Sequence, residues 1–343
     1  MSGGNAASGP AAAAFHRRVA PPNNDSVDWR RRPKVRPRLG PPAAQGLPGG
    51  LETVTGVESI SPPDDPERIH VKRAFVIGHP IAHSRSPLIH GYWLKHYGIE
   101  GSYEPIDVTP DALPDFFARL KAGEFAGGNV TIPHKEMAYA LCDERDPLAE
   151  EIGAVNTLVL KGDEVTGFNT DYLGFLGNLD QNAPGWDKDL EDVIVLGAGG
   201  ASRAILVALK SRNVGRIHLL NRTIDKAEAL AIEFEGKIEC GGLHEFSARA
   251  PNARLVVNTS SVGMKGTTFE AFDLSRLPED AVVTDLVYVP LLTPLLEEAK
   301  TLGLKVVDGL GMLLHQAVPG FEAWFGTKPE VTPELRALVE ATL

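Results

Sequence analysis

Cysteine and long apolar runs are scarce in this chain of 343 residues. The two cysteines, Cys142 and Cys240, cannot build a disulfide framework, which favours a reducing compartment. No apolar stretch approaches the roughly 20 residues that a membrane-spanning helix needs, so we expect no membrane partner. The ten histidines show no H-E-x-x-H pattern and no clustered Cys and His spacing, and we predict no metal site. The G-x-S-x-G elbow of serine hydrolases is also missing.

Acidic residues outnumber basic ones outside the N-terminal segment. Residues 1–50 contain eight Arg or Lys and two Asp, so this segment carries a net charge of +6. The whole chain carries −11, which leaves −17 for residues 51–343. An acidic body is unlike a nucleic-acid-binding domain, and no nucleic acid is expected as its partner. The length and the 43% of hydrophobic residues predict two globular domains.

Residues 1–69 are rich in Ala, Gly, Pro and Arg and have no apolar period. Such a segment cannot bury enough surface to offset the entropy lost on ordering, and we predict a disordered N-terminal extension. A dispensable tail is the simplest interpretation. An Arg-rich targeting segment, a basic arm that binds acidic polymers, and a start of translation further along the chain are the alternatives. The next methionine is Met137, so a start shortly before the body would need a codon other than that for Met.

A glycine-rich turn lies between two predicted strands in the second half of the chain. The apolar run 193–196 is typical of a buried parallel strand, and it leads without a loop into Gly197, Ala198, Gly199, Gly200 and Ala201. Apolar residues then recur at helical spacing, and a second short strand follows at 217–220. A turn with so few side chains lets backbone N–H groups approach a pyrophosphate at the start of a helix. This context predicts a dinucleotide site, with Ser202 at the third glycine position of the usual pattern.

The end of the second strand indicates which dinucleotide is bound. A site for NAD usually has Asp or Glu there, whereas this chain has Asn221, Arg222 and Thr223, followed by Lys226. A planar guanidinium with nearby amide and hydroxyl donors suits a 2′-phosphate. The sequence therefore predicts NADP as the cofactor.

Polar residues gather at three places in the first half of the body. Ser84 and Ser86 precede Pro87 at the predicted start of a helix, where two hydroxyls can hold a carboxylate. Ser86 also suits the role of N-cap, with Pro87 as the first helical residue. Asn129 and Thr131 alternate with apolar residues along an extended segment, so both face the same side. Lys135 follows, and by itself it would be taken for a solvated surface lysine.

Strands and helices alternate along the body, which predicts an α/β fold with a parallel sheet. The third of the polar places is the sequence 169–171, which ends a predicted hairpin and has the residue types of a helix cap. The expected strands are 73–78, 101–108, 153–160, 254–258, 281–286 and 305–307, and the expected helices are 88–97, 110–123, 136–142, 172–179, 225–234, 294–302 and a terminal helix entered at about 309.

Together these segments resemble the shikimate dehydrogenase family from about residue 75 to the end of the chain. Several separate motifs occur in the family's order: S-R-S-P at 84–87, N-V-T-I-P-H-K at 129–135, G-A-V-N-T at 153–157, N-T-D at 169–171, G-A-G-G-A-S-R at 197–203, N-R-T at 221–223 and G-L-G-M-L-L-H-Q-A at 309–317. The resemblance implies two α/β domains around a cleft. The substrate-binding domain would comprise 70–171 and 309–343, and the Rossmann-type NADP-binding domain, with a parallel sheet, would comprise 172–308.

The resemblance also implies an activity and a set of site residues. The reaction would be the reversible reduction of 3-dehydroshikimate to shikimate by NADPH, a step in chorismate and aromatic amino acid biosynthesis. Lys135 would be the catalytic lysine and Asp171 its partner. The substrate would contact Ser84, Ser86, Asn129, Thr131, Lys135, Asn156, Asp171, Tyr288 and Gln316. Leu286 and Gly309 would lie beside the nicotinamide.

Three other functions stay open at this stage. A dual quinate and shikimate dehydrogenase, often with NAD, is a close alternative, although Arg222 disfavours NAD. A non-catalytic nucleotide sensor would need neither Lys135 nor Asp171, and residues 17–38 are compatible with a nucleic-acid-binding arm. We expect a small-molecule substrate, a monomer or a homodimer, and a cytoplasmic location unless the basic extension directs the protein to an organelle.

Overall fold

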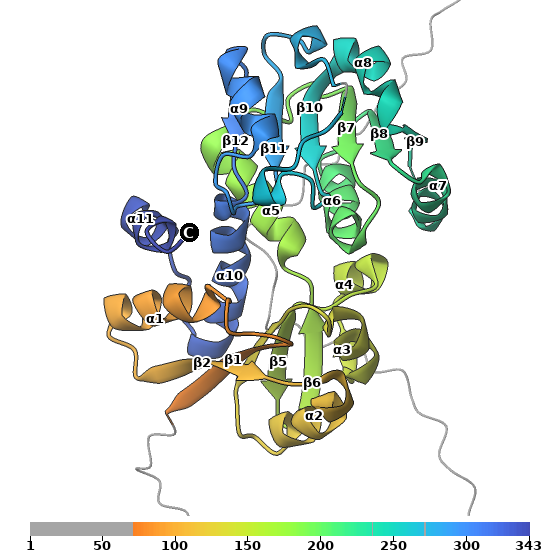
Figure 1. The fold of residues 1–343 in the computed structure, drawn as a ribbon. Helices are drawn as coiled ribbons and strands as arrows, with labels where there is room; N and C mark the ends of the chain where they lie inside the picture. Colours follow the sequence, from red (N-terminus) through yellow and green to blue (C-terminus); the bar gives the residue numbers. More distant parts are fainter. Residues whose placement is uncertain (1–70, 235, 271) are drawn as a thin grey trace, which may run out of the picture.

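The computed structural model describes residues 71–234, 236–270 and 272–343. The predicted disordered extension, residues 1–69, lies outside this described part. Within it, the chain forms two α/β units, each built on its own sheet, and helix α10 (Leu310–Phe325) runs from one unit to the other (Figure 1). This is the predicted fold class. No helix of the described residues is long and apolar enough to cross a membrane.

The first unit is built on a mixed sheet with the strand order β2-β1-β3-β5-β6-β4. Its strands are β1 (Lys72–Gly78), β2 (Gly101–Asp107), β3 (Gly127–Val130), β4 (Glu144–Arg145), β5 (Thr157–Lys161) and β6 (Glu164–Phe168). Strand β1 pairs in parallel with β2 and β3, whereas β5 pairs antiparallel with β3 and β6. Only two residues separate β5 from β6, and so short a connection can join antiparallel strands alone. The hairpin is the reason why this sheet departs from the all-parallel pattern.

Helices cover both faces of the first sheet, and aromatic side chains fill the space beneath them. The helices are α1 (Ser86–Tyr97), α2 (Leu113–Lys121), α3 (Lys135–Leu141) and α4 (Pro147–Ile152). On the α2 side, the ring of Phe75 packs edge-on against Phe116 with 4.8 Å between centroids. On the other side, Trp93 of α1 packs with Phe321 and Trp324 of α10, next to α11 (Pro333–Glu340). The C-terminal helices therefore return to the first unit.

The second unit is a parallel sheet with the strand order β12-β11-β10-β7-β8-β9. Its strands are β7 (Asp192–Leu196), β8 (Arg216–Asn221), β9 (Ile238–Gly242), β10 (Ala253–Asn258), β11 (Val282–Asp285) and β12 (Lys305–Val307), and its helices are α6 (Gly200–Ser211), α7 (Ile224–Glu233), α8 (Phe246–Arg249) and α9 (Pro294–Thr301). The strand order reverses between β7 and β10, and ligands of such sheets bind at the carboxyl ends of the strands at this point. Strand β9 was not predicted, because two of its residues are glycines.

Helices α5 (Asp171–Asn182) and α10 join the two units and pack closely on each other. Small residues permit this approach: a Cβ at Gly311 would lie 1.8 Å from Oδ1 of Asn178, and one at Gly174 would lie 2.6 Å from the carbonyl oxygen of Met312. The Asn178 side chain in turn donates to the carbonyl of Asp308 at 2.7 Å. This packing brings the first turn of α5, which holds Asp171, beside the middle of α10.

Two details of the helix starts differ from the prediction or refine it. The prediction that Ser86 caps α1 is wrong by one residue, because the helix begins at Ser86, Arg85 is the N-cap, and no side chain bonds there as a cap. Asn169 does act on the start of α5: its Oδ1 accepts a hydrogen bond from the backbone N–H of Asp171 at 3.0 Å. Short 3-10 turns complete the fold at Pro110–Ala112, Leu243–Glu245, Ala250–Asn252, Met264–Gly266 and Leu274–Arg276.

His90 lies at the centre of the aromatic cluster between α1 and α10. Its side chain is fully buried, and neither ring nitrogen has a hydrogen-bond partner in the described part of the chain. The ring stacks on Tyr103 with 4.0 Å between centroids. Burial lowers the pKa of His90 to about 3, and the weaker influence of Asn129 acts in the opposite direction. The folded protein therefore holds this histidine neutral, whereas the unfolded chain titrates near its ordinary pKa.

The His90→Phe variant is expected to lose less stability than the wild type as the pH falls from 7 to 5. With a folded pKa of about 3 and an unfolded pKa of 6.5, stability is fully present above pH 6.5 and falls as the pH drops toward 3, because only the unfolded chain takes up the proton. Proton linkage at this single group lowers the free energy of unfolding by about 2 kcal/mol between pH 7 and pH 5. Urea unfolding of wild type and variant at these two pH values measures the difference. Equal losses in both proteins would contradict this explanation.

Candidate active site

A cleft of about 730 Å³ lies between the two units and takes residues from both. All of the predicted substrate-contacting side chains line it: Ser84, Ser86, Asn129, Thr131, Lys135, Asn156, Asp171, Tyr288 and Gln316. Of the predicted cofactor residues, Gly200, Ala201, Leu286 and Gly309 line the same cleft. Gly197, Ala198, Gly199, Asn221, Arg222, Thr223 and Lys226 lie outside this lining, toward the carboxyl ends of β7 and β8. The cleft thus joins the predicted substrate site to the start of the predicted dinucleotide site.

Lys135 and Asp171 form an ion pair in the cleft. Lys135 is the first residue of α3 and Asp171 the first of α5, so each side chain leaves a helix start and points into the space between the units. The Nζ of Lys135 lies 2.6 Å from Oδ2 of Asp171, with 31% of the lysine side chain and 18% of the aspartate side chain exposed. The pair is held inside the protein but can still be reached from the cleft.

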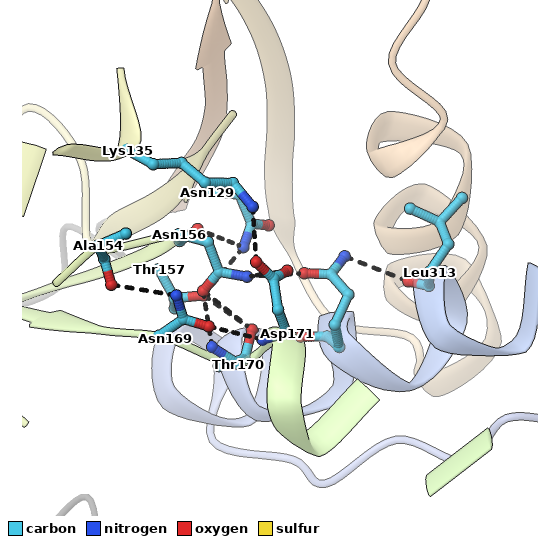
Figure 2. A network of polar contacts seen from close by, with 10 residues as sticks. Asn129, Lys135, Ala154, Asn156, Thr157, Asn169, Thr170, Asp171 and Leu313 are labelled. Atoms are coloured by element: carbon cyan, nitrogen blue, oxygen red, sulfur yellow. Dashed lines mark hydrogen bonds and ion pairs between the residues drawn. The ribbon is translucent and has the colours of Figure 1, made fainter. Parts of the chain in front are cut away.

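Asn156 fixes the carboxylate of Asp171 from its other oxygen (Figure 2). Its Nδ2 donates to Oδ1 of Asp171 at 2.8 Å, while its Oδ1 accepts from the backbone N–H of Thr170 at 2.7 Å. The Asn156 side chain is almost wholly buried, so its orientation is set by these bonds. With Lys135 on one carboxylate oxygen and Asn156 on the other, Asp171 has little freedom to rotate.

Asn129 of β3 is hydrogen-bonded to the same network. Its Oδ1 accepts from the hydroxyl of Tyr103 at 2.5 Å, and its Nδ2 donates to the carbonyl of Asn156 at 3.2 Å and to the hydroxyl of Thr157 at 3.1 Å. Both amide hydrogens are therefore used inside the protein. What Asn129 can still offer to a bound molecule is the second lone pair of its oxygen.

Gln316 brings α10 into the same network. Its Oε1 accepts from Asn156 at 3.3 Å, its Nε2 donates to the carbonyl of Leu313 at 3.2 Å, and its own backbone carbonyl accepts from the hydroxyl of Thr170 at 2.8 Å. The hydroxyl of Thr131 lines the cleft nearby. These groups present amide, hydroxyl and carboxylate atoms to one space, which suits a ligand with several hydroxyl groups.

Ser84, Ser86 and Tyr288 lie at the part of the cleft where α1 begins. The Oγ of Ser84 accepts from the backbone N–H of Ser86 at 3.3 Å, which holds the loop in a turn. Burial raises the pKa of Tyr288, and the charge of Arg85 acts against this effect. The Tyr288 phenol is therefore a neutral hydrogen-bond donor at physiological pH. Three hydroxyls near a helix start form a suitable carboxylate site.

The glycine-rich turn has the shape that a pyrophosphate requires. Ser202 ties the turn together, because its Oγ donates to the carbonyl of Gly197 at 2.8 Å and accepts from the N–H of Gly199 at 3.0 Å. A Cβ at Gly199 or Gly200 would meet no atom within 4 Å, so open space lies over the first turn of α6. The backbone N–H groups of Gly197, Ala198 and Gly199 are already bonded, whereas those of Gly200 and Ala201, at the start of the helix, have no acceptor one turn earlier in the helix. The turn therefore fits the diphosphate of a dinucleotide.

The loop after β8 presents exposed positive charge next to this turn. Asn221 fixes the loop, since its Oδ1 accepts from Ala198 N–H at 3.2 Å and its Nδ2 donates to the Thr223 carbonyl at 2.7 Å. Arg222 and Lys226 are exposed, and neither forms an ion pair with any described residue. Two free cations and the Thr223 hydroxyl beside a pyrophosphate site fit a 2′-phosphate.

Leu286 and Gly309 meet at the back of the cleft. A Cβ at Gly309 would lie 2.5 Å from the carbonyl oxygen of Leu286, so only glycine permits the loop after β11 and the start of α10 to touch. Met312 lines the cleft beside them. This apolar part of the cleft lining is suited to a flat ring.

Two arginines of the cleft were not predicted as site residues. Arg203 of α6 donates through Nε to the carbonyl of Ile152 in α4, and its Nη2 lies 2.6 Å from Oε2 of Glu233, so it bridges the two units. Arg85, between the two serines, also lines the cleft. Both belong to motifs that were recognised, but the sequence gives no sign of which way their long side chains turn. In the described residues, no group of three or more His, Cys, Asp or Glu side chains could hold a metal ion.

Comparisons with known families match nearly all of the described chain. The substrate binding domain of shikimate dehydrogenase matches residues 76–158, the shikimate/quinate 5-dehydrogenase family matches 182–302, and the shikimate 5′-dehydrogenase C-terminal domain matches 309–338. A shikimate dehydrogenase (NADP(+)) from Mesorhizobium japonicum is 55% identical over 272 residues, which cover 79% of this chain and 97% of the relative.

Two solved structures of this family show how similar their folds are to that of this chain. The shikimate 5-dehydrogenase of Thermus thermophilus, in complex with NADP(H) and shikimate, is similar with a TM-score of 0.70 and 39% identity, over 79% of this chain and 100% of that chain. A quinate dehydrogenase from Corynebacterium glutamicum in complex with NAD is similar with a TM-score of 0.72 and 30% identity, over 79% and 99% of the two chains.

Proposed function

The chain belongs to the shikimate dehydrogenase family and catalyses the NADP-dependent interconversion of 3-dehydroshikimate and shikimate, and we propose that Lys135 and Asp171 move the proton of this reaction. The reaction is a step of chorismate and aromatic amino acid biosynthesis. One observation supports the proposed roles most strongly: the 2.6 Å pair of Lys135 and Asp171 lies in the same cleft as Gly200 and Ala201 at the start of the dinucleotide helix.

The proposed chemistry follows from the charges that the reaction creates. Bound NADPH supplies the hydride to the ring ketone. The ketone oxygen gains negative charge as this happens, and the Nζ of Lys135 both stabilises that charge and donates the proton. Asp171 keeps the ammonium aimed at the oxygen and offers its carboxylate to a neighbouring substrate hydroxyl. Because 31% of the Lys135 side chain is exposed, solvent can return the proton to it after product leaves.

The substrate is proposed to lie with its carboxylate at the start of α1 and its hydroxyls toward α5 and α10. Ser84, Ser86 and Tyr288 would hold the carboxylate, and Thr131, Asn156, Gln316 and the free lone pair of Asn129 would hold the hydroxyls. For the cofactor, the turn from Gly197 to Ala201 would hold the pyrophosphate, and the loop of Asn221, Arg222, Thr223 and Lys226 the 2′-phosphate. Leu286 and Gly309 would contact the nicotinamide.

We propose that each of the two units binds a different molecule. Residues 70–171 with 309–343 bind the substrate, and residues 172–308 bind NADP. We further propose a cytoplasmic enzyme that acts as a monomer or homodimer on this small-molecule substrate.

Dual use of quinate and shikimate is a second candidate, because a similar structure is that of a quinate dehydrogenase with NAD. The exposed cations Arg222 and Lys226, which form no ion pair with a described residue, favour NADP. The Lys135–Asp171 pair disfavours a non-catalytic sensor. Purified protein assayed with shikimate or quinate, each with NADP or NAD, tests the proposal through the absorbance of the reduced cofactor. Shikimate with NADP is expected to exceed each other combination by at least about tenfold in kcat/KM. Comparable values for the two acids would establish the dual enzyme instead.

Arg222→Ala is expected to raise the KM for NADP by about 10- to 100-fold and to leave that for NAD almost unchanged. The reason is that only NADP carries the 2′-phosphate that a charged, bidentate group would hold. Since Arg222 is exposed, the difference should shrink as the salt concentration rises. Steady-state kinetics with both cofactors at two salt concentrations measure it. Equal losses with NADP and NAD would show that Arg222 supports the fold instead.

A further inference from the structure

Arg85 places a positive charge at the part of the cleft that holds the two serines. It lies between Ser84 and Ser86 in the loop that enters α1, and all three residues line the cleft. Its charge acts on the phenol of Tyr288, which lines the same cleft from the loop after β11. The guanidinium therefore lies near the hydroxyls to which the substrate carboxylate is assigned.

The other end of the chain holds this guanidinium in place. Its Nη2 donates to the backbone carbonyl of Thr342 at 2.5 Å, across 257 residues of sequence. The Thr342 hydroxyl donates to the carbonyl of Val339 at 2.8 Å, so the end of α11 is itself ordered there. A guanidinium has five N–H donors. A second donor, Nη1, lies 3.5 Å from the carbonyl oxygen of His83. These two carbonyl contacts fix the position of the guanidinium and leave other donors for a ligand.

No carboxylate of the described residues forms an ion pair with Arg85, in contrast to many other arginines of the chain. Arg73, Arg119, Arg203, Arg212, Arg249 and Arg336 each lie within 4.0 Å of an acidic side chain. Residues 51–343 as a whole carry a net charge of −17, which disfavours the approach of an anion from solution. A single cation without a counter-ion reverses this repulsion locally, at the place where a carboxylate is to bind.

We propose that Arg85 is a substrate-positioning residue: held by the carbonyl of Thr342, it attracts and orients the substrate carboxylate and makes the enzyme select the anionic acid over an uncharged analogue. This inference rests on the proposed function, because it takes shikimate as the ligand. It adds a Coulombic contact to the neutral hydroxyls of Ser84 and Ser86. It also gives the last residues of the chain a task at the active site.

Kinetics with shikimate and with its uncharged methyl ester test the proposal. Arg85→Met is expected to raise the KM for shikimate about tenfold at low salt, which corresponds to about 1.4 kcal/mol, and to change kcat less than about twofold. The increase should shrink at high salt, because the arginine is partly exposed. The KM for the ester should change less than about twofold. Arg85→Lys keeps the charge and should retain most of the affinity.

Two further variants complete the experiment. Arg276→Met removes the same charge from an exposed arginine outside the cleft lining and should leave both KM values at the wild-type level. A chain that ends at Ala341 lacks the Thr342 carbonyl and should raise the KM for shikimate a few-fold, again without affecting the ester. Melting temperatures show whether each variant is folded.

The outcomes separate this inference from the proposed function. If the wild type does not oxidise shikimate, the proposed function fails, and this inference fails with it. If the wild type is active but Arg85→Met leaves the KM for shikimate unchanged, or weakens acid and ester equally, only the role of Arg85 is overturned. An unchanged KM in the shortened chain would show that Arg85 acts without the C-terminus.

Discussion

Lys135→Ala is expected to lower kcat by about 10²- to 10⁴-fold, the usual effect of losing a positioned acid or base. The ketone oxygen would gain its charge without a proton donor at hand, so the loss falls mainly on the transition state. The KM for shikimate should change much less, because serine, tyrosine and amide groups remain to bind the ground state. Initial rates at saturating shikimate and NADP measure the effect.

The structure offers a matched control for this variant. Lys121 also pairs with an aspartate, Asp143, at 2.7 Å, and both side chains are about as exposed as Lys135. This pair lies in the same unit but outside the cleft lining. Lys121→Ala should therefore keep kcat within about twofold of wild type. A Lys135→Ala enzyme with near wild-type kcat would contradict the role given to Lys135.

Asp171→Asn is expected to lower kcat/KM by about 10²- to 10³-fold. The new side-chain amide keeps the shape of the carboxylate but loses the charge that aims the Lys135 ammonium. In one of its two orientations it also turns an NH2 group toward Nδ2 of Asn156, where the carboxylate oxygen accepts a hydrogen bond. Both kcat and KM should worsen, since Asp171 is also proposed to hold a substrate hydroxyl. Full saturation curves for shikimate separate the two effects.

A double variant shows whether the two residues act as one unit. If Asp171 works through Lys135, the Lys135→Ala, Asp171→Asn enzyme should be little worse than Lys135→Ala alone. Asp143→Asn, in the control pair with Lys121, should leave kcat/KM near wild type. Losses at Lys135 and Asp171 that multiply would instead show two independent roles.

The fold class could be predicted because its signals are local. The apolar run of β7, the side-chain-poor turn after it and the helical period of α6 are adjacent in the chain, and each has a direct physical reason. Strand β9 was not predicted, because Gly241 and Gly242 interrupt the alternation of apolar residues that indicates a strand. The N-cap of α1 was predicted one residue too late, because Ser86 is already the first helical residue and bonds to Ser84 through its backbone N–H.

The candidate site was only partly accessible from the sequence. Lys135 alone looked like any surface lysine, and its assignment depended on the family resemblance. The bond network of Asn156, Thr170 and Gln316 joins residues up to 160 positions apart, which no local pattern reveals. The same holds for Arg85, whose contact with Thr342 depends on how α11 returns to the first unit.

A crystal structure of the protein with shikimate and NADP bound tests most directly whether the cleft works as described. The hydroxyl that is oxidised should lie within about 3 Å of the Nζ of Lys135, the distance that direct proton transfer requires. The substrate carboxylate should lie at Ser84 and Ser86, and the 2′-phosphate at Arg222. A bound shikimate whose reacting hydroxyl lies away from Lys135 and Asp171 would contradict the proposed mechanism.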